Sequence, residues 1–182
     1  FRSEFLLFVS AVREVELQVI GSDGFSTSHV SKDLGGGNLR IEQPNGDGTD
    51  WMVLSRMHSP SAASRAEVGE AVSRSSVKVT VAVPRRHSKL RIGQFWSYFP
   101  LQDKTSASAL FNAPWSINDD RTTLLRNNYN REILATMANM LVDMVPHLST
   151  PQDQLRIWTS CRLVDERFSR SGTRSSVHTS RL

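Results

Sequence analysis

The 182-residue chain has one cysteine, Cys161, and no long apolar run. A single cysteine excludes an internal disulfide and a cysteine-based zinc site, and it is typical of proteins in reducing compartments. The apolar stretch FLLFV near the start is far shorter than the roughly 20 residues that cross a bilayer. No cleavage-site pattern follows Phe1–Val12, so a signal peptide is not indicated. We therefore expect a cytoplasmic protein without a membrane segment.

Short motifs of common catalytic sites are also missing. The sequence has no G-x-S-x-G nucleophile motif and no G-x-x-x-x-G-K-[ST] phosphate loop. Its histidines lack the paired spacing of a metal site. They are His29, His58, His87, His147 and His178. We therefore predict no metal ligands and no hydrolase activity in this chain alone.

The chain does not start with methionine, and Phe1 begins inside an apolar pattern, so we expect a fragment of a longer protein. The net charge is +4, and three of these charges belong to the arginines of residues 169–182, a stretch without acidic residues. Residues 1–168 therefore carry only +1, which argues against a nucleic-acid-binding body. We predict a single domain over residues 1–168 and a disordered Ser/Arg-rich tail over 169–182.

Hydrophobic periodicity predicts strands followed by helices. A short helix is expected within residues 1–12 and a helix or crossover over 62–72. From residue 130 the apolar period becomes helical, with methionines as core residues, and a second helix is expected over 152–168. This order indicates an α+β (α/β-like) fold with a mixed sheet and C-terminal helices. The predicted strands are 15–19, 27–30, 39–42, 51–57, 77–83, 94–99 and 110–115.

The stretch LFNAPWSINDDRTTLLRNNY, residues 110–129, combines a strand end, a turn and a predicted helix start. Asn112 and Pro114 break the apolar strand, because proline removes a donor and disfavours helical geometry before it. Arg121 is expected in the opening turn of the next helix, where free N–H groups and a guanidinium would form a phosphate seat. The alternative is a surface ion pair with a neighbouring aspartate. The predicted N-cap and first-turn residues are Asn118, Asp119 and Asp120.

The same stretch, with GQFWSYFP before it and YNREIL after it, resembles a region of the GHKL ATPases. It is similar to the segment just downstream of the ATP-binding domain in sacsin-like and ninety-kilodalton heat-shock-protein-like members. The resemblance is clearest over residues 91–148, and residues 1–20 look like the opening of the same region. It implies a transducer-type middle domain with a split βαβ topology.

That resemblance also implies a function. The domain would supply a basic residue to the γ-phosphate of ATP, with ATP and Mg²⁺ held by an upstream domain of the same polypeptide. Arg121 is the first candidate for this contact, and Lys104, in a loop similar to the Q-x-K of gyrase-like members, is the weaker one. The isolated chain would hold no cofactor and hydrolyse nothing, and a chaperone-like parent protein would act on a protein client.

Two further motifs have ordinary explanations. Residues 33–37, DLGGG, match the D-x-G-x-G nucleotide box of GHKL proteins, but the E-x-x-x-N helix and the glycine-rich lid are missing, so we predict a loop between strands. The basic loop 84–91 supports an alternative function, a module that binds nucleic acid or acidic partners non-specifically. Its cations are Arg85, Arg86, Lys89 and Arg91.

Overall fold

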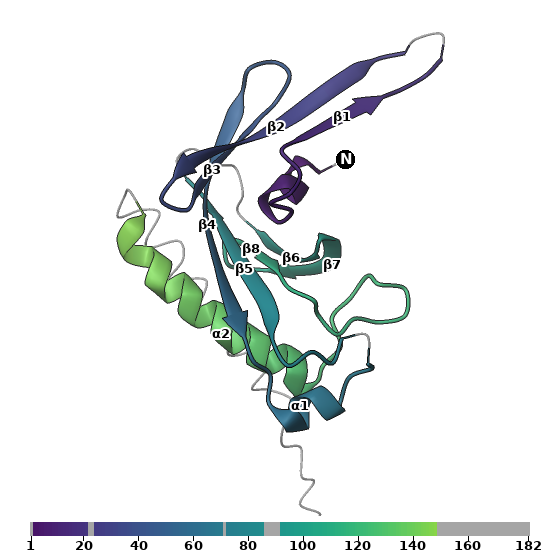
Figure 1. Cartoon of the computed structure of the whole chain (residues 1–182), viewed down its shortest axis with the longest axis vertical. Helices are drawn as coiled ribbons and strands as arrows, with labels where there is room; N and C mark the ends of the chain where they lie inside the picture. Colours follow the sequence, from purple (N-terminus) through teal and green to yellow (C-terminus); the bar gives the residue numbers. More distant parts are fainter. Residues whose placement is uncertain (1, 22–23, 71, 86–91, 149–182) are drawn as a thin grey trace, which may run out of the picture.

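The computed structural model describes residues 2–21, 24–70, 72–85 and 92–148 (Figure 1). This part of the chain contains eight strands, one long helix and three short helices. The strands are β1 Glu14–Gln18, β2 Ser26–Gly35, β3 Asn38–Glu42, β4 Gly48–His58, β5 Val77–Pro84, β6 Gly93–Ser97, β7 Phe99–Thr105 and β8 Leu110–Asn112. The helices are η1 Ser3–Leu7, α1 Ala62–Ala66, α2 Asn128–Met144 and η2 Val145–His147. The α+β class with a mixed sheet is confirmed.

The strands form one sheet in the order β1-β2-β3-β4-β5-β8-β6-β7. Strands β1 to β5 make an antiparallel meander. Strand β8 then inserts between β5 and β6, antiparallel to the first and parallel to the second. The described residues therefore form a mixed sheet, but they do not contain the split βαβ topology that the resemblance implied. A strand, β7, connects the parallel pair β6 and β8, whereas helix α1 joins the antiparallel neighbours β4 and β5.

Helix α2 covers one face of the sheet and forms the main core with β5 (Figure 1). Every second residue of β5 is a valine, and all four valines face the helix, which is the period-2 pattern that predicted this strand. Helix α2 packs against these valines with an apolar stripe that includes Met137, Met140 and Met144, all fully buried. The prediction that these methionines are core residues is confirmed. Burial of each such side chain stabilises the fold by about 1.5–3 kcal/mol.

A smaller cluster lies on the opposite face of the sheet. Leu7 and Phe8, at the end of η1, pack there with Trp51, Trp96 and the strand residues around them. The predicted N-terminal helix is therefore a 3-10 helix of five residues that covers part of this face. Beyond it, the β1–β2 hairpin extends away from the body of the domain (Figure 1).

Several elements differ in length from the prediction, and others lie outside the described residues. The two weak strand predictions at 27–30 and 39–42 correspond to the longer hairpin β2–β3, and the helix predicted over 62–72 shortens to α1. The predicted helix 152–168, Cys161 and the tail 169–182 lie outside the described residues. Among the described helices, none has the length and apolarity needed to span a bilayer.

Candidate functional site

Arg121 lies in a loop between β8 and α2, not in the opening turn of a helix (Figure 1). The ends of this segment, which we call the 117–124 loop, meet in an antiparallel bridge. The side chain of Asn118 closes the loop, because its Oδ1 accepts the N–H groups of Thr122 at 2.8 Å and Thr123 at 3.0 Å. Its carbonyl accepts the Arg121 N–H at 2.9 Å. The predicted helix start is wrong because Asn118 caps a turn.

Arg121 itself is exposed and its backbone is strained. Its φ is +56°, a left-handed conformation that costs a non-glycine residue roughly 1–2 kcal/mol. Its neighbours Asp119 and Asp120, predicted as first-turn residues of a helix, lie in the same exposed turn. Within the described ranges no ion pair involves Arg121, so the alternative surface pair is not formed there.

Hydrogen bonds to strand β7 hold the 117–124 loop against the sheet. The Gln102 N–H donates to the carbonyl of Thr122 at 2.8 Å. The carboxylate of Asp103 accepts the N–H of Leu124 at 2.6 Å. These two bonds fix the backbone immediately after Arg121 to strand β7, so the position of Arg121 relative to the sheet is restrained.

Helix α2 anchors both ends of the same loop through Asn130. This side chain is buried, with its Oδ1 accepting the Ser116 N–H at 2.9 Å. Its Nδ2 donates to the carbonyls of Ser116 at 2.6 Å and Leu125 at 2.7 Å. Sequence reasoning missed Asn130, although an amide at a core-facing position of an apolar helix is a signal of such an anchor.

Asn112 and Pro114, the predicted strand breakers, take part in the same framework. Asn112 ends β8, and its buried side chain accepts the N–H of Tyr98 at 2.7 Å. Tyr98 has a φ of +62° in the turn between β6 and β7, so Asn112 stabilises a second strained residue. The carbonyl of Pro114 accepts the hydroxyl of Tyr129 at 3.3 Å, which links the strand exit to α2.

The start of α2 has few free N–H groups. Asn127 caps the helix, since its Oδ1 accepts the Asn130 N–H at 2.9 Å, and its carbonyl accepts the Arg131 N–H. Glu67, which follows α1, accepts the Asn128 N–H at 2.8 Å and the Asn128 side-chain amide. The predicted phosphate seat of free helix N–H groups beside Arg121 is therefore not formed.

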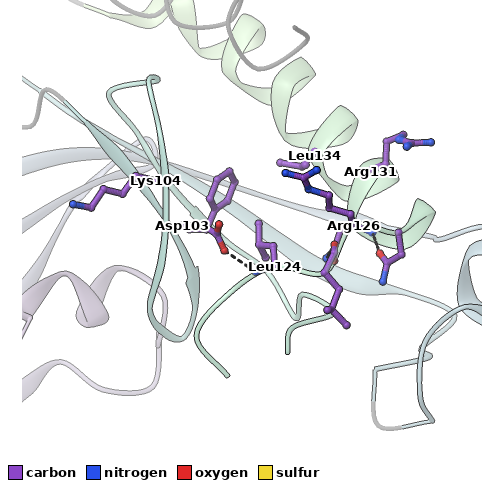
Figure 2. Close-up of a pocket in the computed structure, with 10 residues that line it drawn as sticks. Asp103, Lys104, Leu124, Arg126, Arg131 and Leu134 are labelled. Atoms are coloured by element: carbon purple, nitrogen blue, oxygen red, sulfur yellow. Dashed lines mark hydrogen bonds between the residues drawn. The ribbon is translucent and has the colours of Figure 1, made fainter. Parts of the chain in front are cut away.

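Lys104, the second predicted contact, lies within strand β7 and not in a loop. It pairs with Gln94 of β6, because Leu101 and Thr105 keep the alternation of a half-buried strand. Its side chain is exposed and shares a face of the strand with Gln102, whose N–H holds the 117–124 loop. Figure 2 shows it pointing away from Arg126 and Arg131.

A small pocket of about 190 Å³ lies between β7, the 117–124 loop and the start of α2 (Figure 2). Small-molecule sites usually measure about 300–1,000 Å³, so this pocket suits a side chain or a single anionic group and is too small for a nucleotide. Its lining residues are Phe95, Asp103, Lys104, Leu124, Leu125, Arg126, Asn127, Asn130, Arg131 and Leu134.

The glycine box at 33–37 lies at the tip of the β2–β3 hairpin, where residues 33–35 end β2 and Gly36 and Gly37 form the turn. Gly35, Gly36 and Gly37 have φ values of +81°, +60° and +77°, which glycine adopts without strain. The Gly35 N–H donates to the carboxylate of Asp33 at 2.8 Å, so this aspartate stabilises the turn. The predicted loop between strands is therefore shorter than expected, because residues 33–35 still belong to β2.

Of the basic loop, the structure describes Arg85, whose guanidinium donates to the carbonyl of His147 at 3.0 Å. Arg86, Lys89 and Arg91 lie outside the described residues. Across the described ranges, no group of three His, Cys, Asp or Glu side chains could hold a metal ion.

A separate polar cluster joins β4, α1 and α2 around Glu132. Its carboxylate accepts the hydroxyl of Ser61 at 2.6 Å, the Ser61 N–H at 2.9 Å and the hydroxyl of Ser64 at 3.0 Å. These bonds lower the pKa of Glu132, and the bond from the Ser61 hydroxyl has the largest effect. His58 lies 3.9 Å from the same carboxylate, and its pKa is lowered by burial, which Glu132 partly opposes. His58 and Ser61 are not hydrogen-bonded to each other, so the cluster is not a nucleophile–base pair.

The Glu132 cluster predicts acid sensitivity. Both folded-state pKa values lie below the ordinary values of 6.5 and 4.5, so the stability they provide is present above those values and is lost as the pH falls through the folded ones. We expect Glu132→Gln to melt about 2–4 °C lower at neutral pH and to show a shallower loss of stability below pH 4.5. Melting curves across this range test it, and parallel curves for both proteins would contradict it.

No protein-family model matches this chain, and neither the curated proteins nor the solved structures include one that is significantly similar to it.

Proposed function

We propose that this chain is the second, transducer-type domain of a sacsin-like or heat-shock-protein-ninety-like GHKL ATPase. In this proposal Arg121 contacts the γ-phosphate of an ATP molecule bound by a preceding domain of the same polypeptide. The supporting observation is the geometry of Arg121, an exposed guanidinium without an acidic partner in the described part of the chain, on a strained, hydrogen-bonded loop. Backbone strain at a residue whose side chain forms no ion pair within the described ranges motivates a functional explanation.

The residues of this chain would position one charge. Asn118 and the bonds to β7 keep the loop closed, so little conformational freedom is lost when the guanidinium meets an anion. A planar guanidinium can donate two parallel hydrogen bonds to phosphate oxygens and stabilise charge that develops during phosphoryl transfer. Lys104 is the weaker candidate, and its exposed position beside Gln102 would allow it to approach the same anion.

The proposal includes what the other domain would supply. ATP with Mg²⁺ would bring the phosphoryl group and the metal charge, both held outside this chain. Contact between Arg121 and the γ-phosphate would dock the two domains, and loss of that phosphate would release them. A cytoplasmic, chaperone-like parent protein with a protein client is part of the same proposal.

We expect the isolated 182-residue chain to show no saturable ATP binding and no ATPase activity above background. The pocket near Arg126 is smaller than a nucleotide site, and the 33–37 segment is occupied as a hairpin turn. Isothermal titration with a non-hydrolysable ATP analogue measures this directly. A submillimolar dissociation constant would show that the chain has its own nucleotide site, and would remove the need for a preceding domain.

A further inference from the structure

The pocket beside α2 combines an apolar floor with a cationic rim. Phe95 and Leu134 are almost fully buried and form the floor together with Leu124. Arg126 and Arg131 lie at the rim, one just before α2 and the other in its first turn (Figure 2). A cavity of about 190 Å³ with such a floor fits one apolar side chain.

The rim carries two positive charges that form no ion pair with a described residue, although the carboxylate of Asp103 lines the same pocket and that of Glu67 binds the neighbouring Asn128. Neither Arg126 nor Arg131 forms an ion pair within the described ranges, and the guanidinium of Arg131 donates to the amide oxygen of Asn128 at 2.9 Å. The nearby carboxylate of Asp103 already accepts the Leu124 N–H through one oxygen, at 2.6 Å. Its other oxygen can accept an N–H from a bound backbone.

The helix start does not account for this site. The N–H groups of Asn128, Asn130 and Arg131 have protein acceptors, so an anion here would be held by the two arginine side chains. Lys104 contributes little, because its side chain points away from both arginines (Figure 2). Two guanidinium groups above an apolar floor match a ligand that carries both an apolar group and carboxylates.

We propose that this pocket binds an acidic peptide segment of a partner protein. One apolar side chain of the peptide occupies the floor at Phe95, Leu124 and Leu134, and flanking carboxylates pair with Arg126 and Arg131. The site is separate from Arg121, so it does not depend on the proposed contact with the γ-phosphate. It gives the domain a docking point for an extended, negatively charged chain.

Fluorescence anisotropy with the full 182-residue chain tests the proposal. The probe is a labelled peptide with the sequence Asp-Glu-Leu-Glu-Asp, compared with Asn-Gln-Leu-Gln-Asn and with Asp-Glu-Ser-Glu-Asp. We expect saturable binding of the first peptide, weakened about tenfold or more by Arg126→Gln combined with Arg131→Gln and by either change in the peptide. Lys78→Gln, which removes an exposed positive charge on β5, is the matched control and should leave the affinity unchanged.

Other outcomes would overturn the proposal. Equal binding of the serine peptide would show that the apolar floor is not used. Competition by inorganic phosphate at the same concentration as the peptide would identify a site for small anions, and preferential binding of single-stranded DNA would identify a nucleic-acid surface. Circular dichroism of the double variant checks that it is folded, and amide shifts at Leu124 and Arg131 in the wild-type protein locate the peptide without any substitution.

Discussion

Arg121→Ala in the full-length parent protein is expected to lower the ATP turnover number by about 10–1,000-fold with little change in ATP affinity. The proposed contact forms only when the two domains close, so it stabilises the transition state and not the bound ground state. Arg121 makes no ion pair with the described residues, and its removal costs the domain little stability. Replacement of a residue at positive φ by alanine keeps the same backbone strain.

Steady-state ATPase assays and melting curves of the same variants separate function from stability. Arg121→Lys should restore only part of the turnover, because an ammonium group cannot form the two parallel bonds of a guanidinium. Lys78→Ala, another exposed cation of the domain, should leave turnover at the wild-type value. If Arg121→Ala had normal turnover, the 117–124 loop would be an ordinary surface turn, and the ATPase proposal would lose its main support.

Local patterns were sufficient to predict the elements that form the main core. The alternation of valines in β5 and the apolar stripe of α2 each predict an element and the face that it buries. Both signals depend on residues within one element. The apolar face of α2 and the valine face of β5 then bury each other, which places the helix on the sheet.

The candidate site was harder to predict, because its geometry depends on contacts between distant segments. Asn118 and Asn127 are both good capping residues by sequence, yet the first closes a turn and only the second starts α2. The choice is made by bonds that no local pattern contains. Asp103 holds the loop from strand β7, and Asn130 holds both of its ends from the helix.

The insertion of β8 between β5 and β6 is non-local in the same sense. Sequence predicted that residues 110–115 continue the sheet, and β8 does so. Its neighbours depend on the whole path of the chain, because β8 comes after β6 and β7 in sequence but pairs with β5. This arrangement carries the chain from the middle of the sheet directly into the 117–124 loop.

Asn130→Ala is expected to destabilise the domain by about 3–5 kcal/mol. The substitution leaves the buried Ser116 N–H without its partner and frees the carbonyl of Leu125, whereas the carbonyl of Ser116 loses one of two bonds and keeps the Leu125 N–H at 3.0 Å. A buried polar group without a hydrogen bond costs about 1–3 kcal/mol, and the smaller side chain also leaves a void. Because the free energy of unfolding of a native domain is about 5–15 kcal/mol, the loss is a large fraction of the total stability.

Denaturant unfolding of Asn130→Ala, Asn130→Asp and the wild-type chain measures this effect. The aspartate can accept the Ser116 N–H but cannot donate to the two carbonyls, so it should be no more stable than the alanine variant. Asn139→Ala, which replaces an exposed asparagine of the same helix, is the matched control and should cost at most about 1 kcal/mol. Hydrogen exchange should increase most in the 117–124 loop, since the bonds that tie both of its ends to α2 are lost and only those to β7 remain. If Asn130→Ala unfolded at the wild-type denaturant concentration, Asn130 would not anchor the loop, and the fixed presentation of Arg121 would need another cause.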